Sequence, residues 1–444
     1  MTRDCSHVSR TGWWWLAGWL LLTSATVADD SPAPPAPTAS PPGNSESLAV
    51  TPDSVFQESA FNPDAALPAP VNEICTPSDS GYRFTWAPDK WAQVGAALRI
   101  SGTSATVGQP GGGNYLTIEN ARLLFSGKVH QSIAWELNTD VNLDFPHTPD
   151  GLGLTNAGEI ALLDAIAKFE LHDSFNVWVG RFLTPSDRSN IDGPFNINGW
   201  DFPFVSNYPA IFQGRDNQVT YWGQWGGGQV KWSLGLLDGT GRELQSPYTD
   251  PPDEPPNANG APKLATRITV NFLDPEPGYY HKSTYYGEKD ILALAFAMQT
   301  QANAFGTASN RHDFTGWSFD GLYETKLNEY GSLTVETAYY NFSTQDLVTS
   351  SLDGQAGLIF VGYLLPWKFG GERLAGRLRP FTRYQKYNRT NYEASVGQFD
   401  EGLDLGLEYV IKGPSARVTA FWGNREVVGS GNMDIFRVGV QVVY

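Results

Sequence analysis

The last nine residues of the chain, FRVGVQVVY (436–444), alternate apolar and polar side chains and end on an aromatic residue. Successive side chains of a β-strand point to opposite faces, so this stretch predicts a strand with one apolar and one polar face. The apolar face carries Phe436, Val438, Val440, Val442 and Tyr444. The polar face carries Arg437, Gly439 and Gln441. Such a strand is typical of a β-barrel that crosses an outer membrane, where apolar side chains face lipid and polar ones face the lumen.

The same alternation returns along the chain from residue 91 onward. Five further stretches have it: QVGAALRISG (93–102), QVTYWGQW (218–225), QVKWSLGLL (229–237), KLATRITVNF (263–272) and GLDLGLEYVI (402–411). A soluble sandwich would turn its apolar faces inward, whereas charges on the inner face suit a membrane barrel better. No run of about 18 apolar residues follows residue 30, which excludes a membrane protein built from helices.

Counting the alternating segments gives the predicted architecture. The expected strands lie near 91–106, 114–127, 130–144, 158–171, 174–185, 214–225, 229–240, 262–273, 289–304, 312–327, 330–344, 355–367, 376–390, 400–412, 415–428 and 433–444. Sixteen is an even number, as bacterial single-chain barrels require. We therefore predict an all-β fold, a sixteen-stranded antiparallel transmembrane β-barrel.

The connections between these segments follow a rule with one exception. Barrels of this kind have short periplasmic turns and long external loops, and the long pieces 186–213 and 241–261 both fall on the external side. The stretch 275–289 is long but falls on the periplasmic side. Either a strand is miscounted there, or its four tyrosines belong to an aromatic girdle at the membrane interface. Those tyrosines are Tyr279, Tyr280, Tyr285 and Tyr286.

The amino-terminal residues predict export. Arg3 and Arg10 give a basic start before the apolar run 12–22, and small residues end at Ala28, which is typical of a secretory signal peptide over 1–28. A core helix or an uncleaved anchor is the alternative. Residues 29–80 are rich in Pro, Ala and Ser, so they predict a largely disordered periplasmic tether. The barrel would then occupy 81–444.

Composition narrows the classes of function. The formal net charge of −17 gives no support to nucleic-acid binding. The six histidines are scattered without the spacing of a metal site, and Cys75 would be the only cysteine left after signal removal, so no internal disulfide is expected. No phosphate-binding loop or nucleophile elbow occurs. We expect no cofactor, no metal and no catalytic residue.

Two stretches carry a resemblance to a known family. GRFLTPSDRSNIDGPF (180–195) and GRDNQVTYWGQ (214–224), with the strand count and the aromatic terminus, make residues 81–444 resemble the phosphate-selective porin O and P family of bacterial outer membranes. The resemblance implies a homotrimer of water-filled channels in which the third external loop, here 186–213, folds inward and narrows the channel. It also implies that rows of inward basic residues select anions in some members.

Six residues are candidates for lining or narrowing the channel. They are Asp187, Arg188, Arg215, Arg377, Arg379 and Arg383. The last three share one side of the predicted strand GRLRPFTRYQ (376–385), and their planar guanidinium groups suit phosphate or carboxylate. Mixed charges are ordinary in a wet lumen, however, and Asp187 could cap a turn while Arg188 forms a structural ion pair.

The sequence thus predicts an outer-membrane porin rather than an enzyme. Its expected partners are outer-membrane lipid and small hydrophilic solutes, or anions such as phosphate, which would diffuse through passively. Two other classes stay open: a barrel that serves as a scaffold or docking partner for another exported protein through its tether, and an outer-membrane barrel enzyme.

Overall fold

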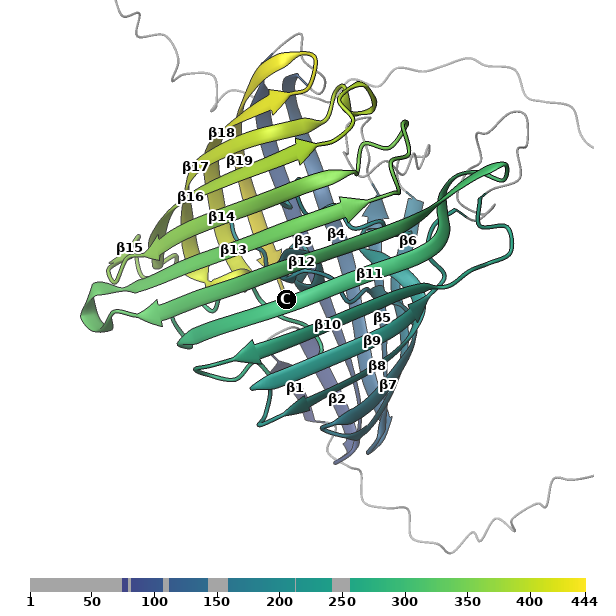
Figure 1. The fold of residues 1–444 in the computed structure, drawn as a ribbon. Coiled ribbons are helices and arrows are strands. Elements are labelled where there is room, and N and C mark those ends of the chain that lie inside the picture. The colour runs from purple at the N-terminus through teal and green to yellow at the C-terminus, as the bar shows by residue number, and fades with distance from the viewer. Residues whose placement is uncertain (1–73, 79–80, 107–111, 143–158, 212, 242–255) are drawn as a thin grey trace, which may run out of the picture. The chain divides into compact units, whose positions relative to one another are not determined.

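The computed structural model describes residues 74–78, 81–106, 112–142, 159–211, 213–241 and 256–444 (Figure 1). In these residues one antiparallel sheet of nineteen strands is present, and sixteen of them form a closed ring. The ring consists of β3 (Lys90–Ala105), β4 (Gly113–His130), β5 (Ile133–Asn142), β6 (Glu159–His172), β7 (Phe175–Leu183), β8 (Arg215–Trp225), β9 (Val230–Leu237), β10 (Lys263–Asn271), β11 (Ile291–Thr307), β12 (Asn310–Lys326), β13 (Ser332–Ser343), β14 (Gly354–Leu364), β16 (Gly376–Arg389), β17 (Phe399–Lys412), β18 (Ala416–Val427) and β19 (Gly431–Val443).

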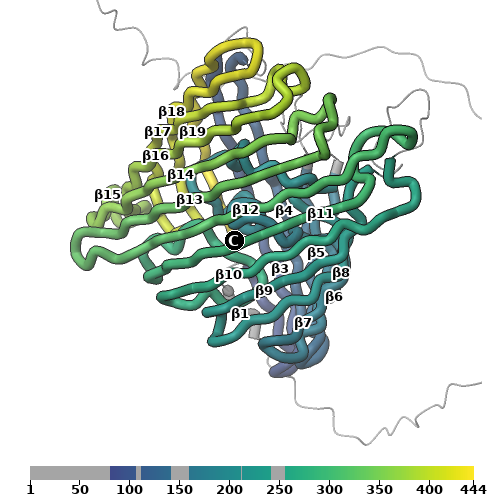
Figure 2. Tube along the Cα trace, in the orientation of Figure 1, coloured from purple at the N-terminus to yellow at the C-terminus, as the bar shows by residue number. Residues whose placement is uncertain are grey.

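Pairing of the last ring strand with the first closes the barrel. β19 lies antiparallel to β3, in register from Ile435 opposite Ala105 to Val443 opposite Ala97. Each of the sixteen predicted segments corresponds to one ring strand, with ends that differ by a few residues. The sixteen-stranded antiparallel barrel is therefore confirmed. Figure 2 follows the chain and shows the ring strands tilted side by side.

Three short strands lie outside the ring. β1 (Ile74–Ser78) and β2 (Gly81–Ala87) form a hairpin, and β2 pairs with the first residues of β3, from Lys90 to Val94. β15 (Lys368–Phe369) pairs with the start of β16. β1 falls at the end of the predicted tether. The predicted signal peptide and the tether up to residue 73 lie outside the described residues.

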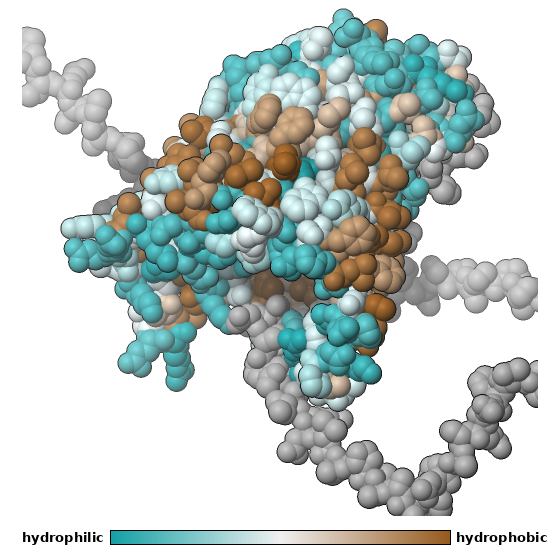
Figure 3. Space-filling view, turned by 60° about the horizontal axis from the view of Figure 1, so that its bottom comes forward, coloured by the Kyte–Doolittle hydropathy of each residue, from teal (hydrophilic) through white to brown (hydrophobic). Residues whose placement is uncertain are grey.

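The outer face of the ring is apolar. Along most ring strands, exposed apolar side chains on the outer face alternate with more buried side chains on the inner face, and Figure 3 shows apolar side chains gathered on the outer surface. Large exposed apolar residues occur on many strands, among them Leu98, Leu294, Phe319, Ile359, Leu405 and Val440. This is the two-faced pattern that a strand between lipid and lumen requires. Within the described residues, no helix is long and apolar enough to cross a membrane.

The structure of the long stretch between β10 and β11 contradicts both predictions for it, a miscounted strand and an interfacial girdle of tyrosines. No strand is miscounted, because β10 and β11 pair with each other on either side of it. Its tyrosines do not form an interfacial girdle either. Tyr279 and Tyr286 are 4% and 5% exposed, and both are buried against interior side chains of the barrel. The stretch is long because it folds into the barrel instead of turning at its rim.

Candidate functional site

The β7–β8 connection (184–214) crosses the barrel interior. It carries the short helix α1 (Arg188–Asp192), which ends at Gly193, where a φ of +67° favours glycine. Side chains from strands on all sides of the ring bond to it: Arg99, Lys263, Arg267, Gln299, Tyr340, Arg379, Arg383 and Arg417. Because strands from several parts of the ring bond to it, this connection lies inside the barrel.

The carboxy-terminal strand makes room for this connection. At Gly439 an added Cβ would lie 2.5 Å from the ring of Trp200, closer than a real Cβ approaches another atom. Trp200 is 1% exposed, packs with the Arg99 guanidinium 4.2 Å from its ring centroid, and donates its indole N–H to Glu119 at 2.7 Å. The glycine in FRVGVQVVY therefore lets the connection lie flat against β19.

The β10–β11 connection (272–290) enters from the other end of the barrel and meets the first one. Arg188 forms two parallel bonds of 2.8 Å with the carboxylate of Glu276. The Ser283 amide donates to the Asn196 carbonyl, and the Asn198 side chain donates to the Ser283 carbonyl. Together the two connections fill the side of the interior beside β7 to β18, and the first also reaches β3 and β19 through Trp200.

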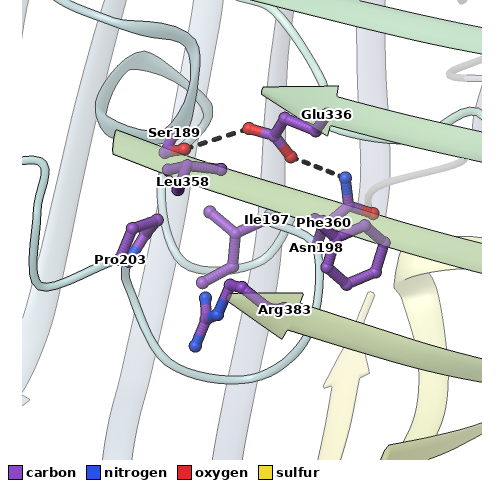
Figure 4. A pocket seen from close by; sticks show the side chains of 8 residues that line it. All are labelled: Ser189, Ile197, Asn198, Pro203, Glu336, Leu358, Phe360 and Arg383. Atoms are coloured by element: carbon purple, nitrogen blue, oxygen red, sulfur yellow. Dashed lines mark hydrogen bonds between the residues drawn. The ribbon is translucent and has the colours of Figure 1, made fainter. Parts of the chain in front are cut away.

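That side is densely packed, and we call it the packed side: the interior faces of β7 to β18 with both connections. Large side chains there are almost fully buried, for example Tyr340, Phe342 and Phe360. Between the β7–β8 connection and the wall of β13, β14 and β16 a void of about 10 Å³ remains, which is the room of about one water (Figure 4). In Figure 4 the Glu336 carboxylate bridges Ser189 and Asn198 beside this void.

The opposite side keeps contact with solvent, and we call it the open wall: the interior faces of β19 and β3 to β6. Near the end where β19 begins, the side chains of Arg437, Glu119 and Asp201 are 16%, 19% and 28% exposed. Near the other end, Lys168 and Glu136 are 13% and 19% exposed. Solvent therefore reaches the interior along this wall from both ends.

Hydrogen bonds and ion pairs link the two ends of the open wall. We call the participants the polar track: Arg437, Asp201, Glu119, Arg99, Asn120, Asp140, Arg122, Gln213, Arg215, Asp164, Asn138, Glu136 and Lys168. Its centre consists of the buried pairs Arg122 with Asp140 and Arg215 with Asp164, at 2.9 Å and 2.7 Å. These central groups are 4% to 6% exposed, so they are almost closed off from solvent.

Charge along the polar track is balanced. The cations are Arg437, Arg99, Arg122, Arg215 and Lys168, and the carboxylates are Asp201, Glu119, Asp140, Asp164 and Glu136. Each cation lies within ion-pair distance of at least one of these carboxylates. This wall therefore presents donors and acceptors in alternation rather than a field of one sign.

The structure distributes the six candidate residues over both sides. Arg215 belongs to the polar track. Arg379 and Arg383 face the interior from β16, bonded to Glu408 and Asp404 at 2.9 Å. Arg377 is half-buried and donates to the Tyr286 carbonyl at 3.2 Å. These three arginines thus hold the two connections and neighbouring acids, and Arg379 and Arg383 do so while at most 3% exposed.

Asp187 and Arg188 lie at the start of α1. Asp187 occupies the N-cap position but makes no side-chain cap bond, and its carboxylate accepts from Ser206 and Tyr340 at 2.6 Å and 2.9 Å. Burial raises the pKa of Asp187 to about 6, against the opposing effect of these bonds. Arg188 is 1% exposed and forms a structural ion pair, whose partner is Glu276 of the second connection rather than the barrel wall.

Sequence reasoning missed most of the polar track and all of the contacts of Glu276. Glu119 and Asn120 are adjacent, yet both bond to interior Arg99, because a β-bulge opposite Arg99 and Ile100 breaks the alternation. Alternation along the strand would have assigned one of the two to the lipid face. Glu276 lies in a connection rather than in a strand, so no alternation predicts the direction of its side chain.

Comparisons with known proteins find similarity in the fold but not in the sequence. The sequence matches no protein-family model and no curated protein. The structure resembles the outer membrane channel DcaP of Acinetobacter baumannii with a TM-score of 0.50 at 12% identity, over 82% of this chain and 98% of that chain. It also resembles OmpF of Salmonella typhi, solved in complex with daunomycin, with a TM-score of 0.50 at 10% identity, over 80% of this chain and 98% of that chain. At these identities the likeness establishes a common fold, the closed antiparallel β-barrel.

Proposed function

We propose that this chain is an outer-membrane channel through which small hydrophilic solutes diffuse along the open wall. The observation that carries the proposal is the polar track, which links partly exposed charged groups near both ends of the barrel. The apolar outer face supports a location in a bilayer, because exposed apolar side chains in such a band need lipid around them. Outer-membrane lipid is therefore the expected surrounding.

The balanced charge supports a channel with little preference between anions and cations. Anion or phosphate preference, which the family resemblance implies, would need guanidinium groups that are free to bind the solute. Arg379 and Arg383 are instead paired with Glu408 and Asp404. We therefore propose that uncharged or zwitterionic polar solutes pass at least as readily as phosphate.

Assembly and the absence of catalysis belong to the same proposal. A homotrimer remains the expected assembly, with lipid around its outer faces. Among the described residues no group of three metal-ligating side chains occurs, and the polar track consists of ion pairs and amide side chains rather than an activated nucleophile with its base. We propose transport, not an enzymatic reaction.

Planar-bilayer recording of the purified full chain tests the proposal. We expect discrete conductance steps, and a reversal potential in a potassium chloride gradient near the value for a non-selective path. A control bilayer with detergent alone should give no steps. Absence of steps at any protein concentration would overturn the channel, and strong anion selectivity would overturn the claim of balanced charge.

A further inference from the structure

The β10–β11 connection makes contacts that a simple turn would not need. It bonds to the β7–β8 connection through Glu276, Lys282 and Ser283. On the packed side its Thr284 hydroxyl and its Tyr285 and Gly287 amides all donate to the carboxylate of Glu324 on β12. It is therefore anchored to the ring at the same time as it holds the other connection.

Aromatic packing fixes the first half of this connection. Tyr279 lies 5.0 Å from Trp178 and 6.1 Å from Trp222, ring centroid to ring centroid, and donates its hydroxyl to the Leu183 carbonyl at 3.0 Å. Lys231 of β9 donates to the Tyr280 carbonyl at 3.0 Å. A buried aromatic cluster of this kind is rigid because each ring is enclosed by several others.

The turn between β8 and β9 fixes the backbone at Glu276. Gly228 has a φ of +104°, and an added Cβ would lie 2.5 Å from the carbonyl carbon and oxygen of Glu276. Glycine is needed there for both its conformation and its lack of a side chain. The Glu276 carboxylate is thus presented to Arg188 from a backbone that cannot move away toward β8 and β9.

Arg188 and Glu276 join the two connections through a bidentate ion pair. Both side chains are 1% exposed, and the carboxylate also accepts the Tyr285 hydroxyl at 2.8 Å. Burial alone would raise the pKa of Glu276, but the charge and hydrogen bonds of Arg188 outweigh it and hold this pKa well below its ordinary value. Breaking the pair would leave an uncompensated buried charge, which is strongly unfavourable.

We propose that Glu276 is a positioning residue for the solute path: through Arg188, the β10–β11 connection clamps the first part of the β7–β8 connection, around α1, against the packed side. The clamp keeps this part from moving further over the polar track, which the same connection already joins through Asp201 and Gln213. This inference rests on the proposed channel function. The β7–β8 connection touches both sides, since Trp200 and Asp201 already contact Glu119 and Arg437 of the open wall. If it is released from Glu276, the same connection can shift toward that wall and narrow the path.

The test combines Glu276→Gln with an accessibility probe that does not depend on conduction. Ser186→Cys in a Cys75→Ser background places a thiol in the β7–β8 connection, at a side chain that is 1% exposed and bonds only to the carbonyl of Thr184. We expect a methanethiosulfonate reagent to label this cysteine roughly tenfold faster or more in Glu276→Gln than in the parent. In bilayers, the same variant should give a lower mean conductance with frequent closures.

Asp353→Asn is the matched control. Asp353 is 5% exposed and accepts from the amide and the hydroxyl of Thr344, so the change also removes one buried carboxylate, but from the segment between β13 and β14. It should leave labelling of Ser186→Cys near the parent rate. Tyr285→Phe, which removes one bond to Glu276, should raise labelling less than Glu276→Gln does and keeps the test available if that variant folds poorly.

The outcomes separate the two proposals. Equal labelling rates in the parent and in both Glu276→Gln and Tyr285→Phe would overturn the clamp, even if the channel conducts. Faster labelling with unchanged conductance would also overturn it, because the released connection would then not reach the path. Absence of conductance in the parent would overturn the channel function, while the labelling result would still report on the contact between the connections.

Discussion

The packed side and the open wall use the same chemical groups for different purposes. On the packed side, Arg379 and Arg417 both pair with Glu408, and all three side chains are completely buried. On the open wall, the outer pairs, such as Lys168 with Glu136, keep solvent contact. The comparison teaches that an inward arginine on a barrel strand indicates a pore-lining group only where no connection covers it.

The largest effect that would sharpen this comparison is expected at Glu408. Glu408→Gln leaves the buried guanidinium groups of Arg379 and Arg417 without their shared carboxylate, so we expect a loss of about 3–5 kcal/mol in the free energy of unfolding. Unfolding in urea followed by tryptophan fluorescence measures it. Glu401→Gln, which removes the exposed partner of Lys386 from the outer face, should cost about 0–1 kcal/mol. Equal losses would contradict a structural role for the packed-side pairs.

An intermediate effect is expected on ion selectivity from the ends of the polar track. Glu136→Gln leaves an excess of positive charge on the open wall and should shift the permeability ratio toward anions by roughly twofold, whereas Lys168→Gln should shift it toward cations. Reversal potentials in a salt gradient report both. If the two variants shift the reversal potential in the same direction, or not at all, these groups do not face the path.

The smallest effect is expected at Arg377. This side chain is half-buried and makes one bond, to the Tyr286 carbonyl. Arg377→Gln should change the free energy of unfolding by about 0.5 kcal/mol or less and leave the reversal potential where it is. A change in selectivity as large as that of Lys168→Gln would place Arg377 on the solute path and extend the open wall toward β16.

Strand alternation predicts the ring and the interior position of its arginines because lipid outside and polar contacts inside impose a period of two. It fails where that period is interrupted. At Asn138 and Thr139 a second bulge inserts Leu163 beside Asp164, and both are buried. The partners of Arg188, Arg379 and Arg383 could not be predicted, since they depend on two connections that have no period and meet only in the folded barrel.

The hairpin of β1 and β2 has a consequence for the width of the barrel. Tyr444 pairs with Ala96 of β3 through two backbone bonds of 2.7 Å and 2.8 Å, and the next outward position of β3, Val94, is already paired with Tyr82 of β2. If β19 shifted by two residues so that its end paired with Val94 of β3, it would collide with β2, which already pairs there. Because the stagger at the closing seam sets strand tilt and diameter in a barrel of given strand number, β2 excludes one set of alternative diameters.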